Sequence, residues 1–388
     1  MNPFVIAKSA KNALSRVEIN FNRLIGRELV PLETTILNIE TSSLCNLECV
    51  FCAYVKKTSP KVSMKDAFFQ NCVEQAVGMG FTQFELTPCT GDVFMDRHIF
   101  NKFQLLEDHP QVEAYRFFTN FTIPNKTNVE RLLRLKKLKN LTVSIYGHDL
   151  ASFIAITKST EKVYNRLVSN LKTLLENLDR KNFNLDIGIR TTNDAPRRAA
   201  SEVMELLEKF RARGVRPRRA HVYNNWGGFV TQADVAGLDI DVTGAEAIYK
   251  RGACAHLFTT YQIMATGIVN GCACRDVDAT LRIGDLNEAP LHEILSPDNP
   301  TYMRLIEEQQ RGEFRAVCKS CDYYKSIYHM RMSRRKDGSE FQSIDEFKDR
   351  LRLAGSPASD NLIKEFANAP RAEPGLEKID AGPATIVS

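Results

Sequence analysis

The sequence predicts an α/β fold, a partial (β/α)6 barrel followed by a small cysteine-rich C-terminal domain. Between residues 34 and 227, runs rich in β-branched and aromatic residues alternate about six times with helical stretches. This alternation is typical of a parallel sheet with right-handed crossovers. Six units are too few to close an eight-stranded barrel. No G-x-G-x-x-G follows the first run, which argues against a dinucleotide-binding sheet.

The strands and helices of the barrel follow one another in a regular order. Strands are expected at 34–40, 81–87, 112–119, 141–147, 183–190 and 218–223. The first helix is expected to open at Ser63, because S-M-K-D has the spacing of a capping box with Asp in place of Glu. The later helices are expected near 98–107, 129–138, 160–178 and 198–213.

The chain divides by composition into five parts. An N-terminal helical extension (1–33) precedes the barrel (34–227), and a glycine- and aspartate-rich linker or insertion (228–253) follows it. The C-terminal domain (254–335) is expected to contain a hairpin around the A-T-G at 265–267 and short helices near 291–295 and 302–311. A C-terminal helix and a flexible tail are expected over 336–388.

Composition and charge exclude several classes of protein. The chain has 388 residues, 43% hydrophobic and 26% charged, with a formal net charge of +5. No run of eighteen apolar residues and no secretory signal is present, so we expect a cytoplasmic protein without a membrane segment. The arginine-rich stretches 211–221 and 329–338 are interpreted as solvated faces, and nucleic acid is not an expected partner. In a reducing compartment, ten cysteines indicate metal ligands or catalysts rather than disulfides.

The sequence C-N-L-E-C-V-F-C places Cys45, Cys49 and Cys52 directly after the first predicted strand. Three thiols on one flexible loop can converge on a soft metal centre. Zinc takes four ligands, often as two pairs of cysteines, whereas an iron–sulfur cluster can take three cysteines and leave one iron open. The isolated triple loop favours the cluster.

This loop resembles the C-x3-C-x-aromatic-C loop of radical S-adenosylmethionine (SAM) enzymes, which carry it after the first strand of a similar barrel. The resemblance implies that Cys45, Cys49 and Cys52 hold a [4Fe-4S] cluster. SAM would chelate the open iron, and Phe51 would lie near its adenine.

Further residues at predicted strand ends resemble the SAM-binding positions of the family. The T-G-D turn after the second strand resembles the G-G-E-P turn that binds the methionyl amine, with Asp in place of Glu and no following proline. A strand-end arginine could pair with the SAM carboxylate through a bidentate fork. Each of them could also be an ordinary polar residue at a strand end. The residues that the resemblance assigns to SAM are Thr90, Gly91, Asp92, Asn120, Ser144 and Arg190.

A second cysteine set lies in the C-terminal domain. Cys254, Cys272, Cys318 and Cys321 could form a zinc ribbon. Their spacing also resembles the auxiliary-cluster domains of the radical SAM superfamily, which begin C-x9-15-G-x4-C. Since no cysteine follows Cys321, the resemblance is to the shorter, twitch type of SPASM-like domain with one auxiliary [4Fe-4S] cluster.

The combination resembles the aminocyclitol dehydrogenase type of radical SAM enzyme. It implies that a 5′-deoxyadenosyl radical abstracts hydrogen from a sugar, aminocyclitol or similar polyol, while the auxiliary cluster accepts an electron. The small-molecule substrate is expected to contact Tyr223, Asn224 and Trp226, and a one-electron donor such as flavodoxin or ferredoxin is an expected partner.

Three alternatives remain open at this stage. The first is a radical SAM epimerase in which Cys274 or Cys89 returns a hydrogen atom, although both cysteines could equally be buried. The second is a peptide-modifying radical SAM enzyme, which is less expected because only about thirty residues precede the first strand. The third belongs to another class, a zinc-binding module that contacts nucleic acid.

Overall fold

A sheet of nine strands forms the centre of the molecule. The computed structural model describes residues 3–32, 35–87, 89–195, 201–220, 222–244, 248–330 and 341–354. The strand order is β12-β11-β10-β2-β3-β4-β5-β6-β7, and the strands from β2 to β7 pair in parallel. This confirms the predicted partial (β/α)6 barrel. Its strands are β2 (Ile36–Ile39), β3 (Gln83–Glu85), β4 (Ala114–Thr119), β5 (Leu138–Tyr146), β6 (Asn184–Arg190) and β7 (Arg218–Ala220).

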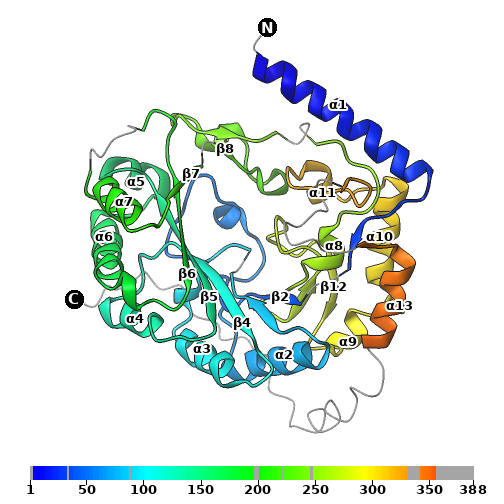
Figure 1. The fold of residues 1–388 in the computed structure, drawn as a ribbon, viewed down its shortest axis with the longest axis horizontal. Coiled ribbons are helices and arrows are strands. Elements are labelled where there is room, and N and C mark those ends of the chain that lie inside the picture. Colours follow the sequence, from blue (N-terminus) through cyan, green and yellow to red (C-terminus); the bar gives the residue numbers. More distant parts are fainter. Residues whose placement is uncertain are drawn as a thin grey trace.

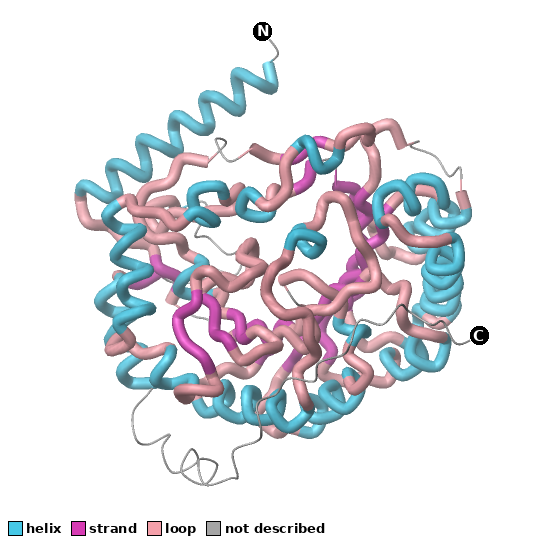
Figure 2. The backbone as a smooth tube through the Cα atoms, turned by 180° about the vertical axis from the view of Figure 1, so that it is seen from behind, coloured by secondary structure: helices cyan, strands magenta, loops and turns pink. Residues whose placement is uncertain are grey.

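Helices surround the barrel strands on the outside, and the opposite face of the sheet lines a lumen (Figures 1 and 2). On β4, Tyr115 and Phe117 turn outward and stack on Phe103 of α3, with ring centroids 5.5 and 5.1 Å apart. Since side chains alternate along a strand, Arg116 and Phe118 turn toward the lumen. The helices are α2 (Asp66–Gly78), α3 (Ile99–Asp108), α4 (Lys126–Leu132), α5 (Leu150–Thr157), α6 (Glu161–Glu176) and α7 (Glu202–Ala212).

Three predictions about the helices are wrong. The helix expected near 129–138 is α4, which ends at Leu132, and Leu138 already begins β5. The first helix begins at Asp66 rather than Ser63, because the Ser63 hydroxyl donates to the Ser42 hydroxyl over 2.9 Å instead of capping a helix. The helix α5 was not expected. Its sequence L-A-S-F-I-A-I-T is short and almost wholly apolar, so it carries no helical period that a sequence pattern could reveal.

The C-terminal domain continues the barrel sheet. β10 (Gln262–Ile263) pairs in parallel with β2, with Gln262 opposite Asn38. The predicted hairpin at 265–267 is present, since β10 and β11 (Ile268–Asn270) pair antiparallel, and β12 (Arg282–Asp285) adds the outermost strand. The helices of this region are α8 (His256–Thr259), α9 (Leu291–Ile294), α10 (Pro300–Arg311) and α11 (Ala316–Ser320).

The remaining elements lie around the barrel. The helix α1 (Pro3–Leu24) projects beyond the body of the molecule in Figure 1. β1 (Val30–Pro31) pairs antiparallel with β13 (Phe341–Gln342), which α13 (Ile344–Ala354) follows. The single strand predicted at 218–223 is two strands, because β8 (Val222–Tyr223) leaves the barrel sheet to pair with β9 (Asp241–Val242). The predicted tail beyond residue 354 lies outside the described residues.

None of the described helices is both long enough and apolar enough to cross a membrane.

Candidate functional site

The first cysteine loop follows the carboxyl end of β2 and is held by hydrogen bonds within the loop. The N–H of Cys52 donates to the carbonyl of Cys49 over 2.9 Å, and the Tyr54 hydroxyl donates to the carbonyl of Cys45 over 3.2 Å. Burial raises the pKa of Cys45 to about 12 and of Cys52 to about 11. Burial also raises the pKa of Cys49, and the charges of the other two thiolates raise it further. A soft cationic centre that neutralises three thiolates fits this loop.

The geometry of the thiols bears on the choice between zinc and a cluster. No three His, Cys, Asp or Glu side chains of the described ranges lie close enough together to hold a single metal ion. In an iron–sulfur cluster each thiolate binds a different iron, so the thiolates stand further apart than the ligands of one zinc ion. The preference for a cluster over a zinc ion rests on the spacing of the cysteines in the sequence.

The turn formed by Thr90, Gly91 and Asp92 packs against the backbone that leads into Cys45. The N–H of Asp92 donates to the carbonyl of Leu44 over 2.8 Å. Gly91 has a φ of +128°, and a Cβ placed there would lie only 2.8 Å from the same carbonyl oxygen. The Thr90 hydroxyl is buried and has no hydrogen-bond partner among the described residues. This turn thus offers an unpaired polar atom beside the cysteine loop.

The Asp92 carboxylate is already held by the chain. It accepts hydrogen bonds from the N–H of Asn120 (2.7 Å), the N–H of Phe94 (3.0 Å) and the Thr119 hydroxyl (2.9 Å). Burial raises its pKa to about 6 despite these bonds, which favour the charged form. Asp92 therefore ties the turn to the end of β4, and its predicted contact with a SAM amine stays a prediction.

Three further predicted residues lie around the same strand ends. The side-chain amide of Asn120 donates to the Asn46 side chain over 3.0 Å, within the cysteine loop. Ser144 is buried opposite Gly188 in the register of β5 and β6, and the space beside Gly188 is open. At the end of β6, the positive charge of Arg190 favours the thiolate of Cys49, although burial dominates and raises the pKa of that thiol.

Three aromatic rings, those of Phe51, Tyr146 and Tyr223, pack together beside the first cysteine loop. The Phe51 ring lies 5.3 Å from that of Tyr146 and 4.7 Å from that of Tyr223. The Tyr223 hydroxyl donates to the carbonyl of Thr191 over 2.9 Å, and the Trp226 indole N–H donates to the carbonyl of Phe51 over 3.0 Å. The predicted substrate residues Tyr223 and Trp226 thus lie against the cysteine loop.

Asn224 orders the turn that carries Trp226. The Asn224 side chain accepts from the N–H of Trp226 over 3.2 Å. Its predicted contact with a substrate remains a prediction.

The second cysteine set gathers around α10 and α11. The thiols of Cys254, Cys272, Cys318 and Cys321 influence one another electrostatically, and burial raises the pKa of Cys254 to about 12 and of Cys321 to about 11. Gln309 contacts two of them, since its amide donates to Cys318 Sγ over 3.3 Å and its carbonyl oxygen accepts from the N–H of Cys254 over 2.8 Å.

Backbone groups complete this second site. The N–H of Tyr323 donates to Cys321 Sγ over 3.2 Å, and the N–H of Lys325 donates to Cys254 Sγ over 3.5 Å. Hydrogen bonds of this kind stabilise thiolates that bind a cluster. The four thiols and their donors therefore fit an auxiliary cluster.

The two remaining predicted cysteines lie near the second set. A hydrogen bond that the Cys272 thiol donates to Cys274 is the largest cause of the raised pKa of Cys272, so these two thiols are in contact. Cys89 is buried in a small cluster with Ala53 and Val277, and burial and then the charge of Cys272 raise its pKa. Neither thiol lines the lumen pocket described next.

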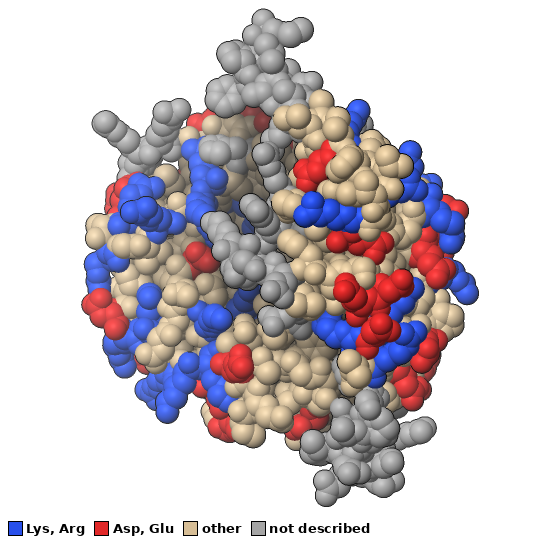
Figure 3. Space-filling view, turned by 45° about the vertical axis from the view of Figure 1, so that its right-hand side comes forward, with Lys and Arg blue, Asp and Glu red and all other residues tan. Residues whose placement is uncertain are grey.

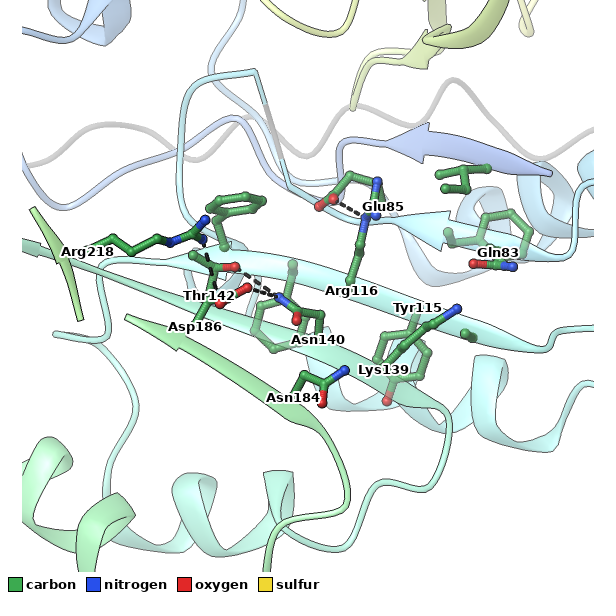
Figure 4. Close-up of a pocket in the computed structure, with 15 residues that line it drawn as sticks. Gln83, Glu85, Tyr115, Arg116, Lys139, Asn140, Thr142, Asn184, Asp186 and Arg218 are labelled. Atoms are coloured by element: carbon green, nitrogen blue, oxygen red, sulfur yellow. Dashed lines mark hydrogen bonds and ion pairs between the residues drawn. The ribbon is translucent and has the colours of Figure 1, made fainter. Parts of the chain in front are cut away.

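A pocket of about 430 Å³ occupies the lumen of the barrel (Figure 4). Its lining contains two ion pairs, with Arg116 Nε 2.7 Å from Glu85 Oε2 and Arg218 Nη2 3.6 Å from Asp186 Oδ1. Asn140 donates to Asp186 over 3.2 Å. Lumen residues of a closed barrel are usually bulky and apolar, whereas these are polar. The other polar side chains of the lining are Gln83, Lys139, Thr142 and Asn184.

The sequence analysis did not find these pocket residues. The signal was present in N-L-T-V-S and N-L-D-I-G-I-R, where polar residues alternate with apolar ones. Strands buried on both faces read as continuous apolar runs, so the alternation indicates that one face lines a polar space.

The comparisons with known proteins agree with this arrangement. Residues 254–322 match the model of SPASM, an iron–sulfur cluster-binding domain, and the match ends directly after Cys321. No curated protein sequence is significantly similar to the chain.

Two solved structures of SuiB from Streptococcus suis share its fold. With SuiB bound to the precursor peptide SuiA, the TM-score is 0.52 at 15% identity, covering 80% of this chain and 75% of that one. With SuiB bound to S-adenosylmethionine, the TM-score is 0.50 at 15% identity, covering 81% and 79%. For BtrN in complex with AdoMet and 2-DOIA, the TM-score is 0.48 at 13% identity, covering 75% and 94%.

The family resemblance is thus confirmed in two respects, the barrel fold and the C-terminal iron–sulfur domain. The chain has the fold of SuiB, and its residues 254–322 match the SPASM model of iron–sulfur cluster-binding domains.

Proposed function

We propose that the chain is a radical SAM enzyme that dehydrogenates a neutral, hydroxyl-rich small molecule such as a sugar or an aminocyclitol. The observation that carries the proposal is the polar pocket in the barrel lumen, whose lining lies toward the amino ends of the strands, while the first cysteine set follows the carboxyl end of β2. When bound, the first cluster and SAM would supply a 5′-deoxyadenosyl radical that abstracts hydrogen from the substrate.

The chain's own residues would place both partners of this reaction. Cys45, Cys49 and Cys52 would hold the first cluster, and Phe51 with Tyr146 would form a wall beside SAM. The buried, unpaired hydroxyl of Thr90 would accept or donate a hydrogen bond toward the SAM end of the site.

The charges of the pocket favour a neutral polyol. Both carboxylates, Glu85 and Asp186, are paired with arginines, so the lining presents donors and acceptors and keeps only the single positive charge of Lys139. Hydroxyl groups satisfy such a surface without the desolvation cost of a charged group. Phe118 is 42% exposed and would pack against the carbon face of a sugar ring.

After one hydrogen atom has been abstracted from the alcohol, formation of the ketone also releases one proton to solvent and needs a one-electron acceptor. The segment that matches SPASM would hold this acceptor, since Cys254, Cys272, Cys318 and Cys321 would saturate a cluster and leave no iron open for substrate. The epimerase and peptide-modifying alternatives use the same first site, and no contact of the described residues favours either.

Product analysis tests the proposal. The anaerobically reconstituted enzyme is incubated with SAM, a reductant and a panel of cyclitols, aminocyclitols and hexoses. We expect 5′-deoxyadenosine and a ketone in equal amounts with at least one compound. Solvent deuterium at the attacked carbon without a ketone would instead support epimerisation, and an absence of 5′-deoxyadenosine with every compound would contradict the proposed substrate class.

A pair of variants localises the substrate. Asp186→Asn disturbs the lumen pocket and is expected to raise KM for the active compound at least tenfold. Lys172→Gln breaks an exposed ion pair with Glu202 on the outer helices and is expected to leave KM unchanged. Equal KM values for the two variants would place the substrate elsewhere.

The alternative from another class, a zinc-binding module that contacts nucleic acid, finds less support. Figure 3 shows acidic side chains among the Lys and Arg side chains of the face that it presents, so basic residues form no unbroken stripe there. Colourless protein with bound zinc and salt-sensitive binding to nucleic acid would favour this alternative.

A further inference from the structure

An ion pair joins the segment that carries Cys272 and Cys274 to the segment that carries Cys318 and Cys321. Arg275 follows Cys274, and Asp322 follows Cys321. Arg275 Nε lies 3.2 Å from Asp322 Oδ1, and the two side chains are only 16% and 4% exposed. Arg275 also donates to the carbonyl of Cys274 over 2.6 Å. Both charges are therefore fixed beside the backbone that carries the thiols.

Two aromatic rings hold the guanidinium. Arg275 lies 4.7 Å from the ring centre of Tyr323 and 5.7 Å from that of Trp226. The Trp226 indole is in turn bound to the carbonyl of Phe51, next to Cys52 of the first set. Since cation–π contacts strengthen when water is excluded, this arrangement keeps the positive charge in place.

The carboxylate of the pair is held just as firmly. Asp322 Oδ2 accepts from the N–H of Asn225 over 3.0 Å, and the Asn225 amide donates to the carbonyl of Ser320 over 2.7 Å. Gly227 brings this turn against α11, because a Cβ there would lie 2.5 Å from the Val317 side chain. The turn at 225–228 thus locks Asp322 in one position.

Fixed charges beside a cluster change its reduction potential. A positive charge stabilises the reduced cluster, which carries one more electron, and a negative charge destabilises it. Both effects are large where the charges are buried, because the local dielectric constant is low. A largely buried pair that Tyr323, Trp226 and Asn225 hold in place can therefore control electron acceptance.

We propose that Arg275 and Asp322 set the reduction potential of the auxiliary cluster in opposite directions, Arg275 raising it and Asp322 lowering it. The inference rests on the proposed function, which places that cluster on Cys254, Cys272, Cys318 and Cys321. It concerns the tuning of electron acceptance, and not the identity of the substrate.

The experiment isolates the auxiliary cluster in the full chain. Cys45, Cys49 and Cys52 are replaced together by Ala, the protein is reconstituted anaerobically, and the remaining cluster is titrated by EPR against redox mediators. In this background, Arg275→Gln is expected to shift the midpoint to a more negative potential and Asp322→Asn to a less negative one. The double variant is expected to return close to the parent, and Arg275→Lys, which keeps the charge, to stay closest to it.

The possible results separate the two proposals. A parent variant without iron would overturn the proposed function, because no auxiliary cluster would exist. Iron in the parent with midpoints that stay constant, or that move in the same direction in both single variants, would overturn the tuning role alone. If Arg275→Gln does not assemble the cluster, Asp322→Asn and Arg275→Lys still test the proposal. A less negative midpoint potential in Asp322→Asn with an unchanged midpoint in Arg275→Lys supports the tuning role. Any other combination contradicts it.

Discussion

Replacing Gly91 by Ala should disturb the first cysteine loop and leave the second site intact. A non-glycine residue at a φ of +128° costs about 1–3 kcal/mol of backbone strain. The added Cβ would also lie 2.8 Å from the Leu44 carbonyl and 2.9 Å from that of Ser42, both backbone atoms that cannot rotate away. The turn must therefore move, and the hydrogen bond from Asp92 to Leu44, worth about 1 kcal/mol, is lost.

Gly214→Ala supplies the matched control. Gly214 also has a positive φ, +85°, but no atom lies within 4 Å of the position that its Cβ would take. The control bears a comparable backbone strain without the contact. The total loss of stability is therefore expected to be about 1–3 kcal/mol for Gly214→Ala and about 2–5 kcal/mol for Gly91→Ala.

Iron analysis and chemical denaturation are the assays. If both sites hold [4Fe-4S] clusters, the wild type binds about eight irons per chain. Gly91→Ala is expected to bind about four, with the EPR signal of the auxiliary cluster unchanged, and Gly214→Ala is expected to keep all eight. Full iron and unaltered SAM binding in Gly91→Ala would refute the reasoning, because the turn would then not support the cysteine loop.

Three further predictions concern Lys102, Asp92 and Trp226. Lys102 is 1% exposed, and its Nζ lies 2.7 Å from a carboxylate oxygen of both Asp66 and Asp96. Lys102→Met leaves the buried Asp96 carboxylate without its cation and should lower the free energy of unfolding in denaturant by about 3–5 kcal/mol. Lys172→Met, at an exposed ion pair, should lower it by no more than about 1 kcal/mol, and equal losses would contradict this. The pKa of Asp92 is raised to about 6, so the folded protein binds its proton more tightly than the unfolded chain, and up to about 3 kcal/mol of stability present near pH 4 should be lost as the pH rises through 6. Unfolding at several pH values should show a loss that is larger by this amount in the wild type than in Asp92→Asn, and identical profiles would disprove it. Trp226 is the one tryptophan of the sequence and lies between the two cysteine sets, so its fluorescence should fall when the clusters assemble, and unchanged emission on full iron loading would place it elsewhere.

The barrel could be predicted because its signals are local. Each strand from β2 to β7 is a short apolar or alternating run between helical stretches, and each was found near its expected position. The pairing of β10 with β2 could not be predicted in this way, since it joins Gln262 to Asn38 across most of the chain through two residue pairs only. No local pattern encodes such a contact.

The grouping of the cysteines could be predicted because their spacing is written in the sequence, and their role as cluster ligands stays a prediction. The pairing of charges is not written there. Asp92 illustrates the limit, since its sequence position suggests a SAM ligand while its carboxylate binds the end of β4. The same holds for Arg275 and Asp322, which are 47 residues apart and meet only because α11 packs on the turn at 225–228.

The central claim is that the two cysteine sets hold two separate clusters and that only the first binds SAM. The most direct measurement is iron analysis with EPR of the anaerobically reconstituted wild type and of two variants, one without Cys45, Cys49 and Cys52 and one without Cys254, Cys272, Cys318 and Cys321. We predict about eight irons in the wild type, about four in each variant, and a SAM-dependent change of the EPR signal only where the first set is intact. Zinc in place of iron, or a SAM-dependent signal in the variant that lacks the first set, would contradict the account.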